Sequence, residues 1–154
     1  EMISRMAVHK GSAFVEIYQN CSVFNDGAFD ELKDRKSKAD HLLVLEHGKP
    51  LVFGKSGDAC VKLDTARMRL YVGKLGEKDG GVEVVHDESN PDPALAMLLA
   101  RCRPPEFPTP IGVLRAVSAP TFEDQSLAQK NAELAARGEG SLEQLLYSGD
   151  RWDV

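Results

Sequence analysis

The sequence lacks long hydrophobic runs and an excess of positive charge, and these two absences exclude whole classes of function. Its apolar runs, such as residues 42–45 and 94–100, are far shorter than the roughly 20 residues that span a bilayer. The 24 acidic residues outnumber the 19 lysines and arginines, which gives a formal net charge of −5. The short apolar runs mean that we expect no membrane segment. Because an acidic surface repels phosphate groups, we also expect no nucleic-acid partner.

Cysteines are few, and none of them form a metal-binding pair. Cys21, Cys60 and Cys102 lie far apart, and an odd number of separated thiols disfavours a secreted disulfide framework. Residues 1–10 lack the continuous apolar core of a signal peptide, and their apolar positions recur at helical spacing. We therefore expect a cytoplasmic protein whose given sequence begins within a helix.

Common catalytic signatures are absent as well. The sequence contains no glycine-rich phosphate loop, no Gly-Asp-Gly diphosphate motif, no HExxH and no GxSxG. No residue of this chain is therefore assigned as catalytic.

Residues 1–36 have the pattern of half a βαβ unit. A helix that ends at Gly11 leads into a β-prone run at 12–18, and a polar loop follows at 19–27. In parallel sheets, ligands usually lie at the loops that follow the carboxyl ends of strands. A short helix at 29–35 then precedes a highly charged stretch, which predicts a domain boundary after residue 36.

Residues 37–154 predict an α+β extension. The runs at 42–46, 50–53, 60–63, 69–72 and 81–85 are short and apolar or alternating, and glycine-containing turns between them predict antiparallel hairpins. The predicted elements that follow are a helix from about Asp92 to Cys102, a strand at 109–115, a helix at 122–137 between Thr121 and Gly138, and a short helix at 142–146.

The loop at 19–27 contains the residue with the clearest chemical potential, Cys21. A thiolate binds soft metal ions, but a single cysteine after a strand is commonly a small buried side chain. An iron–sulfur cluster commonly needs four thiolates, so Cys21 could complete such a site only with ligands from elsewhere. Spacing alone leaves both interpretations open.

The run at 9–30, HKGSAFVEIYQNCSVFNDGAFD, resembles the β subunit of the 2-oxoglutarate:ferredoxin oxidoreductases, within the 2-oxoacid:ferredoxin oxidoreductase family. Further resemblance lies in LEHGKP at 45–50, HD at 86–87, TPIGVLR at 109–115 and GDRWDV at 149–154. It covers nearly the whole chain and is weaker from about 54 to 81. The resemblance implies the C-terminal portion of the subunit: the end of a transketolase-like, thiamine-diphosphate-binding α/β domain with a parallel sheet, then the α+β extension.

The same resemblance implies a chemistry. Enzymes of this family decarboxylate 2-oxoglutarate on thiamine diphosphate, pass electrons singly through a 4Fe–4S cluster to ferredoxin, and form succinyl-CoA from coenzyme A. By the resemblance, Cys21 is the fourth thiolate ligand of that cluster. The other three thiolates, and the groups that hold Mg²⁺ and thiamine diphosphate, come from the rest of the β subunit. An α subunit completes the enzyme, and this segment alone is not expected to be active.

Two asparagines near Cys21 are candidate neighbours of the cluster. Amide groups that donate hydrogen bonds to a cluster sulfur raise its reduction potential, so Asn20 and Asn25 could tune the cluster. Alternatively, they stabilise the turn alone. Cys60 and Cys102 have no neighbours that suggest a metal, and we expect both to be structural.

Four other features have less specific interpretations. His47 and His86 lie at predicted hairpin ends, where histidines are usually solvent-facing or locally hydrogen-bonded. Arg115 could bind a carboxylate or a coenzyme A phosphate, or could form an intersubunit ion pair, and it stays unassigned. The helix at 122–137 carries small residues that suit close packing, either within the chain or against the α subunit.

Two rival functions remain at this stage. The chain could belong to an enzyme of the same class that acts on pyruvate or a branched-chain 2-oxoacid. It could also be a non-enzymatic assembly or interaction module in which Cys21 is an ordinary core residue.

Overall fold

The computed structural model describes residues 2–150, which form two compact units. Within the described residues, the first comprises 2–8 and 14–117, and the second comprises 9–13 and 118–150. The final motif that resembles the family, at 149–154, lies mostly outside the described residues. The predicted boundary after residue 36 remains a prediction.

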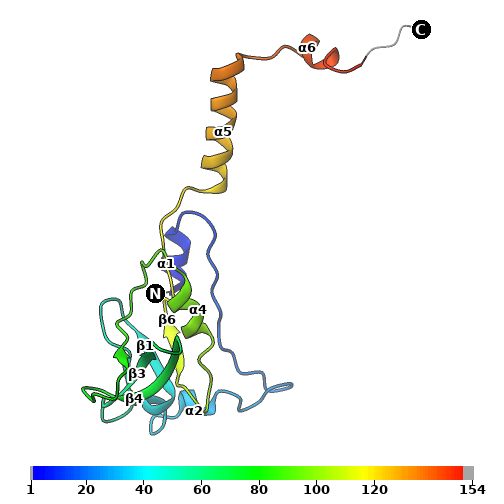
Figure 1. The fold of residues 1–154 in the computed structure, drawn as a ribbon. Coiled ribbons are helices and arrows are strands. Elements are labelled where there is room, and N and C mark those ends of the chain that lie inside the picture. Colours follow the sequence, from blue (N-terminus) through cyan, green and yellow to red (C-terminus); the bar gives the residue numbers. More distant parts are fainter. Residues whose placement is uncertain (1, 151–154) are drawn as a thin grey trace. The chain divides into compact units, whose positions relative to one another are not determined.

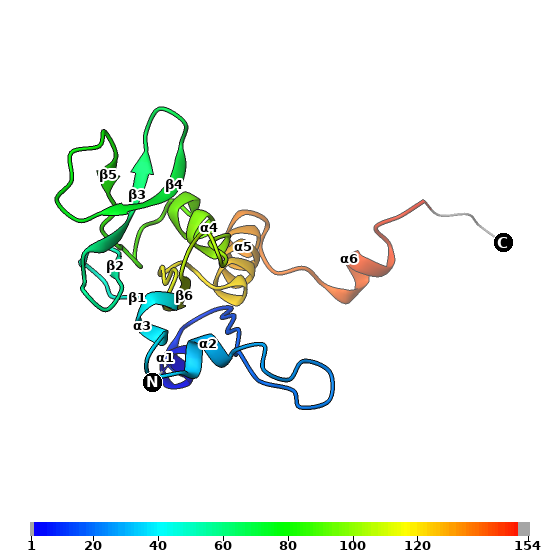
Figure 2. The ribbon, with the colours of Figure 1, turned by 90° about the horizontal axis from the view of Figure 1, so that it is seen from below.

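A four-stranded antiparallel sheet forms one part of the first unit. Strand β3 (Ala59–Asp64) pairs with β2 (Val52–Phe53), β4 (Arg69–Lys74) and β5 (Val82–Glu83), so β3 is central (Figure 2). Three successive residues of β3, 60–62, are buried, so both faces of this strand are covered. Val61 packs in the hydrophobic core, and Lys62, on the opposite face, bonds Asp79 and the Glu77 carbonyl.

A second, two-stranded sheet is parallel. Strand β1 (Leu42–Leu45) pairs with β6 (Thr109–Gly112), with Leu42 opposite Thr109 (Figure 1). Leu43 and Leu45 are buried whereas Val44 is 55% exposed, which is the period-two alternation of a strand with one buried face.

Helix α4 (Ala94–Ala100) contributes Leu99 to the hydrophobic core that joins these sheets. Helix α4 begins after Pro93. Because proline has no backbone N–H, this position has no donor that needs a hydrogen-bond partner. The buried core residues are Leu43, Leu45, Leu51, Val61, Leu70, Val84, Leu99 and Cys102. This core lies entirely within residues 42–117.

The sequence patterns predicted these elements well, with one wrong pairing. The strands at 50–85 form antiparallel pairs as expected, and the combination of helices with parallel and antiparallel strands confirms a mixed α/β content. The expected antiparallel hairpin for the run at 42–46 is wrong, because β1 pairs in parallel with β6. Alternating hydrophobicity specifies a buried face, but it carries no information on a partner more than sixty residues away.

The predicted strand at 12–18 is also wrong in this structure. The segment between α1 (Met2–Val8) and α2 (Asp30–Lys33) has no strand, and most of the side chains at 12–18 are exposed, Phe14 by 89% and Ile17 by 69%. A β-prone run becomes a strand only when a neighbour receives its backbone hydrogen bonds. No segment among residues 2–150 pairs with it.

The connection from α2 to β1 is a short helical segment. Helix α2 is shorter than the predicted helix at 29–35, and it is followed by α3 (Lys38–His41), which leads directly into β1. Helix ends are the least certain part of any sequence-based prediction because the first and last turns contribute few interactions.

The second unit contains two capped helices, α5 (Phe122–Arg137) and α6 (Leu142–Leu146). Thr121 and Ser141 each form a reciprocal capping box with the side chain three residues later. Thr121 thus begins its helix as the sequence predicted. Gly138, with φ +77°, ends α5 as expected. Every described side chain of both helices is exposed in this chain. No helix within residues 2–150 is long and apolar enough to cross a membrane.

Candidate functional site

The loop around Cys21 is closed by three nested contacts, and we call residues 18–29 the Cys21 loop. At its base the rings of Tyr18 and Phe29 stack, with centroids 5.3 Å apart and planes 22° from parallel. In Figure 2 the chain before α2 correspondingly runs out and doubles back on itself. Residues 22–26 are exposed, whereas Asn20, Cys21 and Gly27 are half-buried.

Asn20 joins the two arms of the Cys21 loop through both ends of its amide. Its Nδ2 donates to Asp26 Oδ1 at 2.9 Å, and its Oδ1 accepts from the backbone N–H of Gly27 at 3.0 Å. Gly27 has φ +77°, a left-handed conformation that glycine adopts without strain. The side chain of Asn20 therefore holds the loop closed, as the turn-stabilising interpretation predicted.

Cys21 lies at the start of a tight turn within this closure. The backbone N–H of Asn25 donates to the Cys21 carbonyl at 2.9 Å, and the two residues form an isolated antiparallel bridge. Backbone N–H groups of Phe24 and Val23, and more weakly Asn25, hydrogen-bond the thiol and lower its pKa. Hydrogen bonds of this kind favour the thiolate, which is the form that binds metals.

The Cys21 loop supplies one thiolate, which could bind one iron atom of an iron–sulfur cluster. The described part of the chain contains no group of three or more His, Cys, Asp or Glu side chains that could hold a metal ion. A cluster bound through Cys21 would therefore need its other ligands from outside residues 2–150, as the family resemblance implies. The cluster-ligand role of Cys21 and the tuning roles of Asn20 and Asn25 remain proposals.

The other two cysteines lie inside the core of the first unit. Cys60 is fully buried in β3, and Cys102 is 7% exposed just after α4. Burial raises the pKa of both thiols, that of Cys102 to about 11. Their thiols therefore stay protonated at neutral pH, in contrast to the environment of Cys21.

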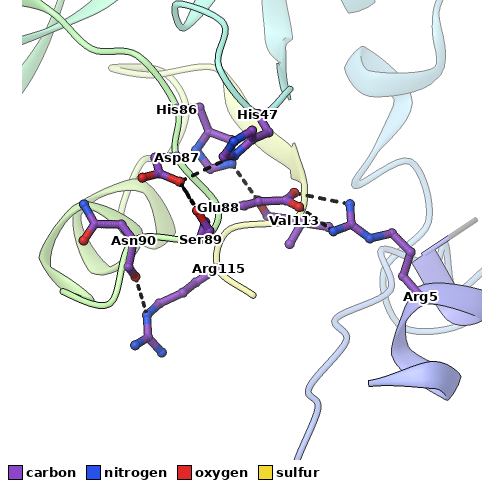
Figure 3. Close-up of polar contacts among 9 residues, drawn as sticks. All are labelled: Arg5, His47, His86, Asp87, Glu88, Ser89, Asn90, Val113 and Arg115. Atoms are coloured by element: carbon purple, nitrogen blue, oxygen red, sulfur yellow. Dashed lines mark hydrogen bonds and ion pairs between the residues drawn. The ribbon is translucent and has the colours of Figure 1, made fainter. Parts of the chain in front are cut away.

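Three family-like motifs that are distant in sequence meet in one polar cluster, shown in Figure 3. The backbone N–H of Gly48 donates to the His86 carbonyl at 2.8 Å, and the N–H of His86 donates to the Lys49 carbonyl at 2.9 Å. The His86 ring Nε2 lies 2.8 Å from the Val113 carbonyl, so the ring links this strand pair to the segment after β6. The sequence did not predict this convergence.

His86 is 1% exposed, which differs from the solvent-facing or locally bonded position expected for it. Its bond to Val113 places a proton on Nε2, because a carbonyl can only accept. The Nδ1 atom is buried and finds no hydrogen-bond partner within residues 2–150. Through Nε2 the ring therefore has a structural role, since it ties residue 86 to the backbone of Val113.

The rim of this polar cluster carries paired charges. His47 Nδ1 lies 3.5 Å from Asp87 Oδ1, and Ser89 donates to the same carboxyl from its backbone and hydroxyl, which lowers the pKa of Asp87. Arg5 forms a bidentate pair with Glu88 at 2.5 and 3.2 Å, and this contact lowers the pKa of Glu88.

Arg115 is engaged with backbone in this structure. Its Nε donates to the Asn90 carbonyl at 3.2 Å and its Nη2 to the Pro91 carbonyl at 2.7 Å (Figure 3 shows the first bond). The guanidinium thereby fixes the segment before α4. These bonds to backbone carbonyls give Arg115 a structural role that needs no bound carboxylate or phosphate.

A buried charge network in the hairpin region was not predicted from the sequence. Lys62 is fully buried in β3, and its Nζ donates to Asp79 Oδ1 at 3.1 Å and to the Glu77 carbonyl at 2.6 Å. Burial disfavours its charged form, but Asp79 outweighs that effect and raises the pKa of Lys62. Burial likewise opposes ionisation of Asp79, and the bonds from Lys62 and Tyr71 lower its pKa nevertheless.

The geometry of the Lys62–Asp79–Tyr71 network indicates a structural role. A Cβ on Gly81 would lie 1.9 Å from Tyr71 Oη, so any larger residue there would displace the Tyr71 ring from Asp79. The signal in the sequence was a lysine in the middle of an otherwise apolar strand, ACVKLD, followed by an aspartate before two glycines.

The first unit also has an open groove of about 530 Å³ beside β1 and β2. Its lining is mainly apolar and includes two lysines, Lys38 and Lys49. The lining residues are Lys38, Ala39, Leu42, Val44, Glu46, Lys49, Pro50, Val52, Phe53, Gly54 and Ile111. Lys49 is paired with Glu46, so the groove presents no concentrated charge for an anionic ligand.

Comparison with known proteins gives a match over the whole chain. It is 36% identical, over 159 aligned positions, to 2-oxoglutarate oxidoreductase subunit KorB of Mycobacterium tuberculosis. The alignment takes in 100% of this chain and 41% of that relative, so the chain spans about two fifths of the relative's length. No protein-family model matches the chain, and no solved structure matches it significantly. The chain is thus a relative, along its full length, of a 2-oxoglutarate oxidoreductase subunit, which confirms the resemblance predicted from its motifs.

Proposed function

We propose that this chain forms part of the β subunit of a 2-oxoglutarate:ferredoxin oxidoreductase and supplies one thiolate, Cys21, to its 4Fe–4S cluster. The enzyme would convert 2-oxoglutarate and coenzyme A into succinyl-CoA and CO₂ and pass the electrons to ferredoxin. Two observations support the proposal: the similarity to subunit KorB over the full chain, and the environment of Cys21.

The observation that carries the proposal is the closed turn around the Cys21 thiol. Backbone N–H groups of Phe24 and Val23 favour its thiolate, whereas the thiols of Cys60 and Cys102 are buried and remain protonated. Cys21 is also less buried than these two thiols, so the chain leaves it accessible to groups from another segment. When bound, a 4Fe–4S cluster supplies a one-electron store between substrate oxidation and ferredoxin.

The remaining cofactors would be held outside this segment. The chain has no Gly-Asp-Gly motif, so Mg²⁺ and thiamine diphosphate would bind the rest of the β subunit and the α subunit. On this proposal residues 1–36 close the thiamine-diphosphate-binding domain and residues 37–154 form the extension. A reducing cytoplasm suits such a cluster, because exposed thiolate-bound iron is sensitive to oxidation.

The test is a Cys21→Ser variant of the complete complex, purified without oxygen. We expect the iron content to fall by about a quarter or more, since one of four thiolate ligands is lost, with a matching change in visible absorption and in the electron paramagnetic resonance spectrum. The matched control, Cys60→Ala, removes a thiol from the same chain and should keep the iron and both spectra. Unchanged iron and unchanged spectra in Cys21→Ser would instead favour a non-enzymatic interaction module with an ordinary thiol.

A separate assay addresses the substrate. Turnover of the complete complex on 2-oxoglutarate, pyruvate and a branched-chain 2-oxoacid, with ferredoxin as acceptor, should be fastest on 2-oxoglutarate. The name of the relative supports this order. Faster turnover on pyruvate or on the branched acid would assign the chain to that enzyme of the same class.

A further inference from the structure

We infer that helix α6 of one copy of this chain docks in the groove beside β1 and β2 of a second copy, and that two copies exchange this contact reciprocally. The contact is apolar, with opposite charges at its edge. The inference goes beyond the proposed function, because it concerns assembly and does not require a bound cluster.

The groove lies on the face of the parallel strand pair that points away from the core. Leu43 of β1 is completely buried in the core. Its neighbours Leu42 and Val44 alternate to the other face, where they line the groove with Ile111 of β6. Parallel sheets are generally covered on both faces, most often by helices. Val44 stays 55% exposed in the described part of one copy, so this face still lacks its second layer.

Helix α6 carries an apolar stripe of the kind that fills such a groove. Leu142, Leu145 and Leu146 occupy positions i, i+3 and i+4, which lie on one side of a helix. Each of these three leucines is about 70% exposed. The capping box of Ser141 stabilises the first turn without any burial. Leucines at this spacing are typical anchors of a short amphipathic helix that binds an apolar groove.

The groove and the α6 segment match in size and in the sign of their charge. A cavity of roughly 150 Å³ holds one benzene-sized group, so a groove of about 530 Å³ has room for the three leucine side chains of α6. The charged residues that line the groove are two lysines and one glutamate, which gives a net charge of +1. Residues 138–150 contain three acidic residues and no lysine or arginine, which gives −3. Opposite net charges favour their association.

Both surfaces stay uncovered within a single copy, which points to a second copy as the occupant. Every described side chain of α6 is exposed, and so is Val44 in the groove. A reciprocal exchange between two copies covers two grooves and two leucine stripes with the same pair of surfaces. Closed twofold assemblies of this kind are the commonest among soluble oligomers.

The test is a cross-link between two differently tagged copies of this chain, produced together in the complete complex. One copy carries Lys49→Cys at the groove, and the other carries Ser148→Cys just after α6. A short bis-maleimide then joins thiols that lie close together. We expect a product with the mass of two copies that carries both tags. Pairs in which only one copy is substituted measure the background from the native thiols.

An apolar variant tests the leucine stripe. Leu145→Asp, added to the Ser148→Cys copy, should lower the yield of the two-tag product about tenfold, because the contact of one leucine with the groove is lost. The matched control is Leu127→Asp in α5, which replaces another exposed leucine of the second unit and should leave the yield unchanged.

A charge exchange tests the edge of the groove. Lys38→Glu in the groove copy, or Glu143→Lys in the helix copy, should lower the yield about twofold to fivefold, and the two reversals together should restore it. The inference is wrong if no two-tag product forms, or if Ser148→Cys is joined to the α subunit instead. It is also wrong if a copy with both cysteines is cross-linked only within itself, or if Leu145→Asp and Leu127→Asp give equal yields.

Discussion

Two regions of the chain, residues 42–117 and residues 12–29, differ in how far their apolar side chains are buried. In the former, Leu43 and Leu99 are completely buried between two sheets and a helix. In the latter, Phe14 is 89% exposed and Phe24 is 90% exposed. The core of residues 42–117 is therefore supplied by the chain itself, whereas residues 12–29 have the apolar composition of buried structure without the burial.

This contrast shows that the shape of a polar turn and the burial of apolar side chains depend on different contacts. The Cys21 loop keeps its shape through bonds between residues at most eleven positions apart, so its turn forms without a surrounding core. The strand predicted at 12–18 depends on a neighbour, and it does not form within residues 2–150. On the proposed function, that neighbour belongs to the rest of the enzyme.

The core of residues 42–117 should be the most sensitive to substitution. Leu99→Ala leaves a cavity where α4 meets the core, and we expect the free energy of unfolding to fall by about 2–5 kcal/mol. The change is measured by urea denaturation of the chain followed by circular dichroism. Val44→Ala, at a position 55% exposed in β1, is the control and should cost much less. Similar losses for the two variants would contradict the proposed position of the core.

The buried ion pair gives the next effect. Lys62→Met removes the cation that holds Asp79 and the Glu77 carbonyl, so the loop at 75–81 should exchange its amide hydrogens faster and the thermal midpoint should drop. Lys74→Met, on the exposed edge of β4, is the control.

The same pair predicts a pH dependence with two limits. The pKa of Asp79 is lowered, so its stabilisation is present above about pH 4 and is lost as pH falls through the lowered value. The pKa of Lys62 is raised, so its stabilisation is present below about pH 10 and is lost as pH rises through the raised value. Lys62→Met should flatten both limbs of the thermal midpoint plotted against pH. Unchanged limbs would show that the pair does not control them.

A smaller effect is expected in the second unit. Thr121→Ala removes the cap of α5 and should destabilise that helix by about 0.5–2 kcal/mol. Hydrogen exchange at residues 122–125 would rise, with α4 as the internal reference. Unchanged exchange at those residues would mean that the capping box does not limit opening of the helix.

The smallest effect is expected at Phe14, in the exposed segment at 12–29. Phe14→Ser should change the free energy of unfolding of this chain by about 0.5 kcal/mol or less, because the side chain is 89% exposed. A loss of several kcal/mol in urea denaturation would mean that Phe14 packs within the chain itself.

The sequence predicted the elements of the fold better than their partners. Period-two runs identified β3 and β4, and the Thr121 and Gly138 signals gave both ends of α5. The parallel pairing of β1 with β6 was missed because the pattern of β1 records only which face is buried. Residues 12–18 were misassigned because β propensity cannot supply a hydrogen-bonding neighbour.

The role of the candidate site remains a prediction from the sequence motif. The motif around Cys21 pointed to that residue as a cluster ligand, and the structure adds the geometry of its loop. The direction of the Asn20 amide could not be read from the sequence, since an amide beside a cysteine can bond the sulfur or the turn with equal ease. Only the folded loop assigns it to Asp26 and Gly27.

The most direct measurement is the position of iron in a structure of the complete complex, located by its anomalous X-ray scattering. We expect an anomalous peak at bonding distance from Cys21 Sγ, with the other ligands of that cluster outside the 154 residues of this chain. If the Cys21 side chain contacts carbon atoms alone and every iron peak is remote from it, Cys21 is not a cluster ligand.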